Sequence, residues 1–177
     1  MSSGAILVLP RTVHDELQRH LLRNPNANEE AAFVFAKHST AGNRFTFIEW
    51  FPVPPEGFVV QLPYHFELTD ETRARVIKRA HDLGSSIIEF HSHTGPWPAQ
   101  FSPSDWSGFE EVVPHMWWRL KGRPYAAVVV AKTGFDAFAW LADPNTPTRL
   151  SGISVDGELL EPSRLSSLER NGYDWKI

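Results

Sequence analysis

The sequence predicts a single α/β domain with a central mixed β-sheet flanked by helices. The chain has 177 residues, of which 42% are hydrophobic and 21% are charged, as is typical of one globular domain with a sizeable core. Short apolar runs of strand length alternate along the chain with longer segments whose apolar residues recur at helical spacing. We therefore treat residues 1–177 as one domain.

The first part of the chain contains four apolar runs of strand length and one amphipathic segment. The amphipathic segment predicts a helix from Thr12, as its N-cap, to about Leu22. The run Phe58–Leu62 is expected at a sheet edge, because a proline follows it. The strands are expected at Ala5–Leu9, Ala31–Lys37, Arg44–Phe51 and Phe58–Leu62.

The second part of the chain continues this alternation. Thr69–Leu83 gives the clearest helix signal, because Gly84 can close it. Ser102–Leu120 is also predicted to be helical, with a break near Pro114. A terminal helix is expected at Pro162–Arg170. The strands are expected at Ser86–Phe90, Tyr125–Ala131, Asp136–Leu141 and Arg149–Val155.

Composition excludes several classes of protein. The chain has no cysteine, which excludes disulfide scaffolds, thiolate zinc sites and cysteine nucleophiles. The net charge of −4 and the absence of a basic run argue against a nucleic-acid surface. The apolar run before Pro10 is too short for a signal peptide or a membrane span. We expect a soluble cytoplasmic protein without membrane contact.

The chemistry is concentrated in two short motifs. His91 and His93 are two residues apart on an extended segment, so their rings point to the same side and can converge on a metal ion. Ser102, Pro103 and Asp105 follow, in the pattern of a helix-capping box. The capping role and a metal role are compatible. Asp105, on the first helical turn, can supply a third ligand and leave a fourth position open for water.

These residues resemble the JAMM (JAB/MPN-type) metalloproteases, whose signature is an upstream glutamate, His-x-His, a loop of about seven residues and Ser-x-x-Asp. The loop Thr94–Phe101 has eight residues here. The resemblance covers residues 9–141 and leaves 142–177 as a C-terminal extension. It implies an MPN/JAB-like fold with the layering of the cytidine deaminases.

The resemblance also implies roles for individual residues. Zinc would be held by His91, His93 and Asp105, and the Ser102 hydroxyl would donate to the oxyanion. The upstream glutamate would be the general base and acid. We assign it to Glu29.

The choice of Glu29 depends on the spacing of small residues. In the family, small residues follow the glutamate three and seven positions later, and from Glu29 these are Ala32 and Ala36. From Glu30 the corresponding residues are larger, so Glu30 stays the alternative.

Other polar and aromatic residues receive weaker assignments. Glu89 shares a strand face with His91 and could orient it, although an exposed edge position is equally plausible. Trp117, Trp118 and Trp140 are expected in the core. Two further tryptophans, Trp97 and Trp106, are expected in the core or at its rim, where they could line a substrate groove. Six histidines are interpreted as surface or packing residues: His14, His20, His38, His65, His81 and His115.

The implied function is a zinc-dependent peptidase or isopeptidase that cleaves after the C-terminal glycine of a ubiquitin-like protein. The compact chain resembles stand-alone bacterial members, which accompany ubiquitin-like conjugation systems and antiviral defence pathways. The implied partners are the ubiquitin-like protein, its conjugates and conjugation-pathway enzymes. Three alternatives remain, namely a metal-free scaffold that binds proteins, a processing peptidase for a sulfur-carrier protein, and a hydrolase of a small amide. The oligomeric state is left open.

Overall fold

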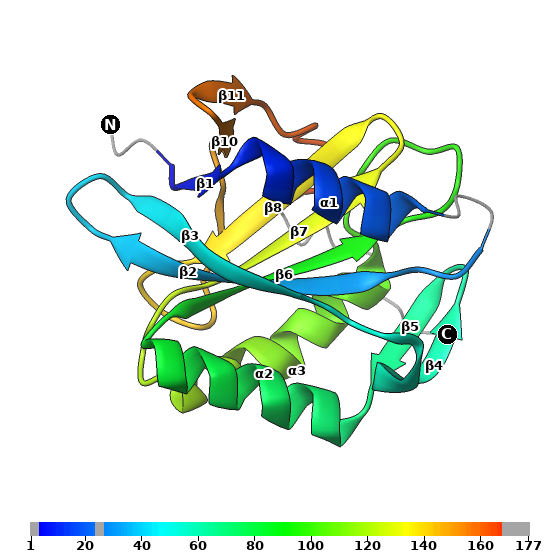
Figure 1. Cartoon of the computed structure of the whole chain (residues 1–177), viewed down its shortest axis with the longest axis horizontal. Coiled ribbons are helices and arrows are strands. Elements are labelled where there is room, and N and C mark those ends of the chain that lie inside the picture. The colour runs from blue at the N-terminus through cyan, green and yellow to red at the C-terminus, as the bar shows by residue number, and fades with distance from the viewer. Residues whose placement is uncertain (1–3, 24–26, 168–177) are drawn as a thin grey trace.

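The computed structural model describes residues 4–23 and 27–167, and within them a mixed sheet lies between α1 (Arg11–Leu22) and the pair α2 (Asp70–Leu83) and α3 (Pro103–Arg119) (Figure 1). The strand order is β11-β10-β1-β3-β2-β6-β7-β8-β9. The pairs β1–β10, β1–β3 and β6–β7 are parallel and the others antiparallel. A mixed sheet with helices on both faces is therefore confirmed.

The strands of this sheet agree closely with the predicted apolar runs. Two of them, β9 and β11, are only two and three residues long. Of these nine strands, β11 was not predicted. The single strand predicted at Arg149–Val155 is divided into β9, which pairs with β8, and β10, which pairs with β1 at the other end of the sheet. The strands are β1 (Ile6–Leu9), β2 (Ala31–Ser39), β3 (Arg44–Pro52), β6 (Ser86–Ser92), β7 (Tyr125–Ala131), β8 (Gly134–Trp140), β9 (Thr148–Arg149), β10 (Gly152–Val155) and β11 (Glu158–Leu160).

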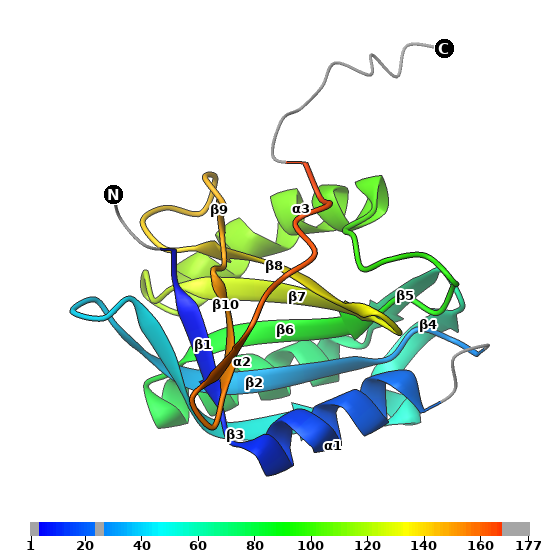
Figure 2. The ribbon, with the colours of Figure 1, turned by 90° about the horizontal axis from the view of Figure 1, so that it is seen from above.

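The sheet has a hydrophobic core on each face, because its central strands are apolar on both sides. Along β2, Val34 packs in the cluster that faces α1, whereas Phe33 and Phe35 pack in the cluster that contains α2 and α3 residues. The continuous apolar run of β2 is thus explained by burial on both faces. Figure 2 shows the three helices on the two sides of the sheet.

A short hairpin stands apart from the main sheet. It follows the 3-10 helix η1 (Pro55–Gly57) and consists of β4 (Phe58–Leu62) and β5 (His65–Leu68), which pair only with each other. The predicted strand Phe58–Leu62 is therefore real, but it lies in a separate two-stranded sheet. Its partner β5 was not predicted.

Two helices begin and end where their capping residues place them. The Thr69 hydroxyl accepts a hydrogen bond from the Thr72 backbone N–H, and Gly84 closes α2 with φ +59. Ser102 and Asp105 form a reciprocal capping box at the start of α3. In contrast, α1 begins at Arg11 with Pro10 as its N-cap, so the predicted Thr12 cap is wrong by two residues.

Two helix predictions are wrong. α3 runs through Pro114 without a break, because packing of its apolar face offsets the missing hydrogen bond. Residues 162–167 are not helical, and 168–170 lie outside the described residues. The side chains of Ser163 and Ser166 bond to other segments instead, and Arg164 has a positive φ of 59°.

The tryptophan predictions have a mixed outcome. Trp140 is buried, and Trp106 and Trp117 are partly buried against the core. Trp118 is 71% exposed, because Phe109, Val113, Met116 and Leu120 form the buried face of α3 and Trp118 lies outside it. Trp97 is 76% exposed, and so belongs neither to the core nor to its rim.

None of the helices in the described part of the chain has both the length and the apolar character needed to cross a membrane.

Candidate metal centre

The two histidines of the motif lie at the end of a central strand. His91 is in β6, opposite Ala31 of β2, and is 1% exposed. His93 follows the strand, and its backbone N–H donates to the carbonyl of Val130 at 2.9 Å. Ser92, between them, accepts a hydrogen bond from the Glu30 N–H through its hydroxyl, at 2.9 Å. The backbone around both histidines is therefore fixed by neighbouring strands.

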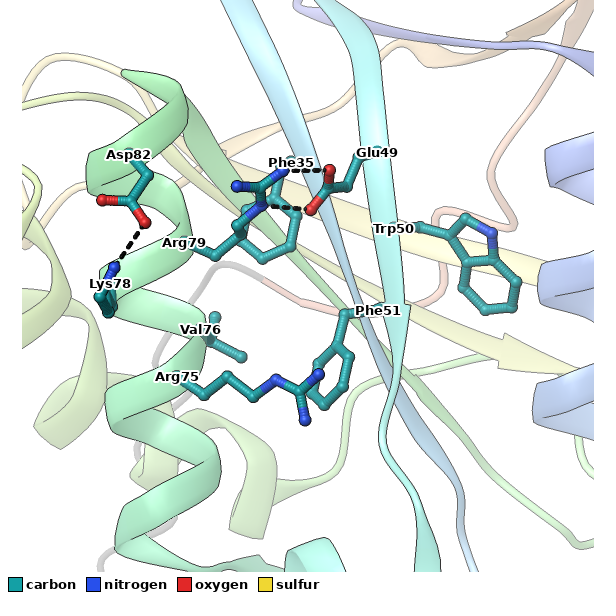
Figure 3. Close-up of a pocket in the computed structure, with 9 residues that line it drawn as sticks. All are labelled: Phe35, Glu49, Trp50, Phe51, Arg75, Val76, Lys78, Arg79 and Asp82. Carbon is teal, nitrogen blue, oxygen red and sulfur yellow. Dashed lines mark hydrogen bonds and ion pairs between the residues drawn. The ribbon is translucent and has the colours of Figure 1, made fainter.

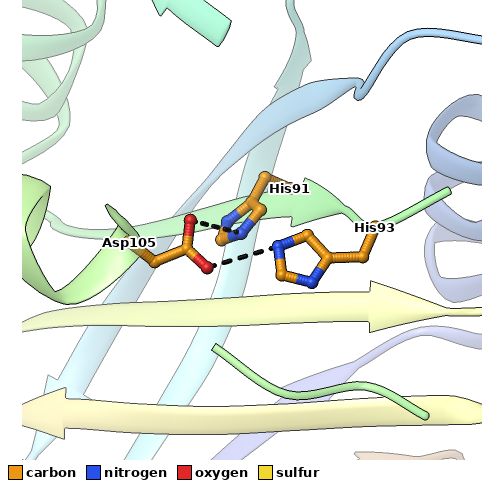
Figure 4. Close-up of side chains that lie close together, drawn as sticks. All are labelled: His91, His93 and Asp105. Carbon is orange, nitrogen blue, oxygen red and sulfur yellow. Dashed lines mark ion pairs between the residues drawn. The ribbon is translucent and has the colours of Figure 1, made fainter. Parts of the chain in front are cut away.

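Asp105 reaches the histidines from the first turn of α3 (Figure 4). Its Oδ1 lies 3.4 Å from His91 Nε2, and its Oδ2 lies 3.2 Å from His93 Nε2. One candidate ligand atom from each of the three residues lies within 4.8 Å of the others. Both ring nitrogens of His91 are buried and have no hydrogen-bond partner among the residues that the structure describes. A buried polar atom without a protein partner is the arrangement expected of a side chain that binds a metal ion.

Ser102 lies beside this cluster as the N-cap of α3. Its backbone N–H donates to Asp105 Oδ2 at 2.7 Å, and its hydroxyl accepts from the Asp105 N–H at 3.1 Å. The capping box thus orients the Asp105 carboxylate. The hydroxyl hydrogen of Ser102 is free of that bond and can donate elsewhere.

The two adjacent glutamates, Glu29 and Glu30, have different contacts in the structure. Glu29 is 5% exposed, and its Oε1 lies 3.8 Å from His93 Nε2. Glu30 instead accepts two hydrogen bonds from Arg23, at 2.7 and 3.0 Å. Of the two, Glu29 is therefore the carboxylate that lies at the candidate metal site.

The site is electrostatically coupled. The pKa of Glu29 is raised to about 7, because the effect of burial is larger than the opposite effect of the nearby His91. Burial opposes the charge on His91, but Asp105, Glu89 and Glu29 raise its pKa to about 9. Asp105 is also desolvated, yet the two histidines and the Ser102 N–H hold its pKa below the usual range. Without an ion, the cluster therefore favours a charged His91 beside an ionised Asp105.

Glu89 lies behind His91. Its Oε1 lies 3.8 Å from His91 Nδ1, and its Oε2 accepts a hydrogen bond from the Tyr125 hydroxyl at 2.6 Å. The Glu89 side chain is only 16% exposed, so the exposed edge position is ruled out. A carboxylate facing the distal nitrogen of a ligand histidine is the usual arrangement around a bound metal.

A groove of about 750 Å³ adjoins the cluster. Residues of β5, α2 and α3 line most of it, and Phe33 and Glu89 of the sheet also line it. Its lining mixes apolar side chains such as Phe66, Ile77 and Phe109 with several carboxylates. Two histidines interpreted from the sequence as surface or packing residues, His65 and His115, also lie along it.

Hydrogen bonds hold the hairpin against the site. The Glu29 N–H donates to the Leu62 carbonyl, and the Gln61 side-chain amide donates to the Glu29 carbonyl, both at 2.9 Å. The Thr94 hydroxyl donates to the Pro63 carbonyl, also at 2.9 Å. The hairpin therefore fixes the position of Glu29 and borders the groove.

A second pocket of about 340 Å³ lies between β3 and α2 and shares no lining residue with the groove (Figure 3). Glu49 accepts two hydrogen bonds from Arg79 there, and the Arg75 guanidinium lies 4.5 Å from the centre of the Phe51 ring. Its charged side chains are thus already engaged with protein groups. We assign no function to this pocket.

Comparisons with known proteins bear on the fold alone. No family model and no curated protein matches the chain. Among solved structures, the chain is similar to the solution structure of protein DSY2949 from Desulfitobacterium hafniense, with a TM-score of 0.58 and 17% sequence identity. The match covers 87% of this chain and 94% of that one. At this identity the similarity supports the α/β architecture and carries no argument about activity.

Proposed function

We propose that the chain is a zinc-dependent peptidase or isopeptidase of the JAMM type, with an MPN/JAB-like fold. One observation carries the proposal. His91, His93 and Asp105 converge at ligand distance, with the buried Glu29 carboxylate 3.8 Å from His93. This combination has three metal ligands and a nearby proton acceptor, as in catalytic zinc sites.

The donor set fits zinc. Two imidazole nitrogens and one carboxylate oxygen are ligands that zinc accepts, and three protein ligands leave one tetrahedral position open. His91 Nε2 faces Asp105 and its Nδ1 faces Glu89, yet neither nitrogen has a hydrogen-bond partner among the described residues, which supports a cation between His91 and Asp105. When bound, zinc would supply an acidified water and polarise the scissile carbonyl.

Residues of the chain would then supply proton transfer, stabilisation of the oxyanion and orientation of a ligand. Glu29, with its pKa raised by burial to about 7, is suited to accept a proton and return it to the leaving amine at neutral pH. The Ser102 hydroxyl would donate a hydrogen bond to the developing oxyanion. Glu89 would orient His91 through its distal nitrogen. No covalent intermediate with the protein is required.

We infer that the substrate is the C-terminal tail of a ubiquitin-like protein, cut after its final glycine during maturation or deconjugation. The groove along the β4–β5 hairpin supports this inference, because an extended tail could lie there and reach Glu29. We place the protein in the cytoplasm, in a bacterial ubiquitin-like conjugation or antiviral pathway. Its partners there would be conjugates and conjugation enzymes.

One alternative has its own support. The groove, at about 750 Å³, lies within the range of small-ligand sites, which favours a hydrolase of a small amide as the second candidate. A metal-free scaffold is disfavoured by the complete donor set, because such a scaffold has no need to bring two histidines and two carboxylates together in one site. A processing peptidase for a sulfur-carrier protein would use the same site and the same chemistry.

The test combines metal content with cleavage. Zinc per chain would be measured by atomic emission on the purified protein. Cleavage would be measured on a ubiquitin-like protein with extra residues after its terminal glycines. Glu29→Gln should retain zinc and lose cleavage by at least about 100-fold, because general acid–base catalysis contributes that much. Glu30→Gln is the matched control, since it removes the neighbouring carboxylate, which pairs with Arg23.

Each outcome decides a separate part of the proposal. Zinc bound by wild type, with cleavage lost only in Glu29→Gln, supports the whole proposal. Zinc with no cleavage of any tailed protein, but hydrolysis of small acylated amines, transfers the proposal to the second candidate. No zinc after addition of the metal would overturn the enzyme proposal and favour the scaffold.

A further inference from the structure

Asp136 is a fully buried carboxylate that the proposed mechanism does not use. It lies in β8, is 0% exposed, and accepts hydrogen bonds from the backbone N–H groups of Ala137 and Ser166, at 3.0 and 2.9 Å. Arg149 Nη1 lies 3.8 Å from its Oδ1. A buried charge is costly unless it is paired and hydrogen-bonded. Asp136 therefore needs its contact with Ser166, which lies outside any helix or strand.

Ser166 belongs to residues 161–167, which we call the clamp segment. This segment follows β11 and crosses the strands toward α3 (Figure 2). Besides its bond to Asp136, Ser166 accepts a hydrogen bond on its hydroxyl from the Phe101 N–H at 2.8 Å. Its carbonyl accepts another from Arg149. Ser166 is thus bonded through its N–H, its hydroxyl and its carbonyl.

A second serine repeats the pattern. The Ser163 N–H donates to the Phe135 carbonyl at 2.7 Å, and its hydroxyl donates to the Ala99 carbonyl at 2.6 Å. Between the two serines, the Leu165 carbonyl accepts from the Gln100 side-chain amide at 3.3 Å. The clamp segment is therefore bonded on one side to β8 and on the other to residues 99–101.

Those residues end the loop that connects the two metal motifs. Phe101 packs against the His91 ring, with 5.8 Å between ring centroids, and also against Trp106 and Phe138. Ser102, whose capping bonds orient the Asp105 carboxylate, follows it directly. A displacement of Phe101 would therefore disturb both the ring of one ligand and the carboxylate of another.

We propose that Asp136 and Ser166 are positioning residues, and that through them the clamp segment holds the loop between His93 and Ser102 where Asp105 meets the histidines. This inference rests on the proposed function for its metal, but the geometry it describes belongs to the chain itself. The positive φ of Arg164, unusual for a residue with a side chain, supports a segment held by its contacts rather than by its own propensity.

The experiment compares Ser166→Ala with wild type, with Glu161→Gln as the control because Glu161 is exposed on the same segment. Hydrogen exchange of the Phe101 amide would report on the loop in the metal-free protein. Zinc affinity, measured by competition with a chromophoric chelator, would report on the site. Ser166→Ala should speed exchange at Phe101 and weaken zinc affinity about tenfold, as loss of outer contacts does in other metal sites. Glu161→Gln should change neither.

Asp136→Asn provides a second variant of the same shape, whose amide cannot accept hydrogen bonds on both side-chain atoms. Near-ultraviolet circular dichroism would establish that each variant is folded at the assay temperature. If exchange of the Phe101 amide becomes faster but both folded variants keep the zinc affinity of wild type, the positioning role is overturned. If wild type binds no zinc, the proposed function fails. Unchanged exchange at Phe101 in Ser166→Ala would then overturn the clamp, and faster exchange would support it.

Discussion

At the scale of single residues, two adjacent glutamates at the candidate site contact different side chains. Glu29 and Glu30 are adjacent and both buried, yet one faces His93 and the other pairs with Arg23. Successive side chains of an extended chain point to opposite sides, so only one of the two can face the histidines. The role proposed for Glu29 therefore depends on its position at the entrance to β2 as much as on its chemistry.

Glu89 is the residue whose change should alter metal binding without removing a ligand. Glu89→Gln keeps the shape of the side chain but removes the charge that faces His91 Nδ1. We expect zinc affinity to fall by about tenfold, in line with the effect of carboxylates behind ligand histidines. Chelator competition would measure the change. Tyr125→Phe, which removes the hydroxyl that holds Glu89, should give a smaller decrease, and an unchanged affinity in both variants would contradict this role.

The sequence predicted the candidate ligands better than it predicted their surroundings. The structure brings His91, His93 and Asp105 together with Ser102 beside them, and their proximity was predictable because their spacing is local and chemically restrictive. The bond between Glu89 and Tyr125 joins residues 36 positions apart, and no local pattern indicates such a contact. The sequence placed Glu89 on the His91 face but could not decide whether that face was buried there.

At the scale of elements, the accuracy of prediction follows how local the determining interactions are. Thr69 and Gly84 bound α2 as predicted, because capping bonds involve residues only a few positions away. The hairpin strand β5 and the edge strand β11 were missed, because short strands are stabilised by partners rather than by their own pattern. The absence of helix at 162–167 has the same origin, since Ser163 and Ser166 bond to β8 and to residues 99–101.

Pro114 gives a direct test of how α3 is stabilised. A proline in a helix interior removes one hydrogen bond and costs about 3 kcal/mol, yet α3 is continuous because its residues Phe109, Val113 and Met116 are buried in the core. We expect Pro114→Ala to raise the free energy of unfolding by about 1–3 kcal/mol, measured by urea denaturation. Pro103→Ala is the control, because proline at the first helical position is well tolerated and its replacement should have little effect. A loss of stability in Pro114→Ala would mean that the proline ring contributes packing that exceeds the missing bond.

At the scale of the whole molecule, the candidate site joins segments that are distant along the chain. Glu29 precedes β2, the histidines end β6, Asp105 begins α3, and the hairpin and the clamp segment support them from two sides. Few of these contacts can persist when the chain unfolds. A metal bound here is therefore bound mainly by the folded state, because the unfolded chain has no cysteine and keeps only the local pair His91 and His93 close together.

This linkage predicts a strong effect of zinc on thermal stability. With free zinc at about 100 times its dissociation constant, the folded state should gain about 2.7 kcal/mol. For a domain of this size, that corresponds to an increase in Tm of roughly 5–10 °C. Scanning calorimetry with and without zinc would measure it, and a chelator should reverse it.

Asp105→Asn tests whether the increase in Tm comes from zinc bound at the candidate site or from a general effect of the added zinc salt. Asparagine keeps the shape of the side chain and can accept the hydrogen bond from the Ser102 N–H, so the start of α3 should be retained. It removes the anionic ligand, and the increase in Tm with zinc should shrink to about half or less, since tenfold weaker binding alone lowers the gain by about 1.4 kcal/mol. An equal increase in wild type and in Asp105→Asn would show that zinc acts elsewhere on the protein. It would also remove the main physical support for a metal centre at the two histidines.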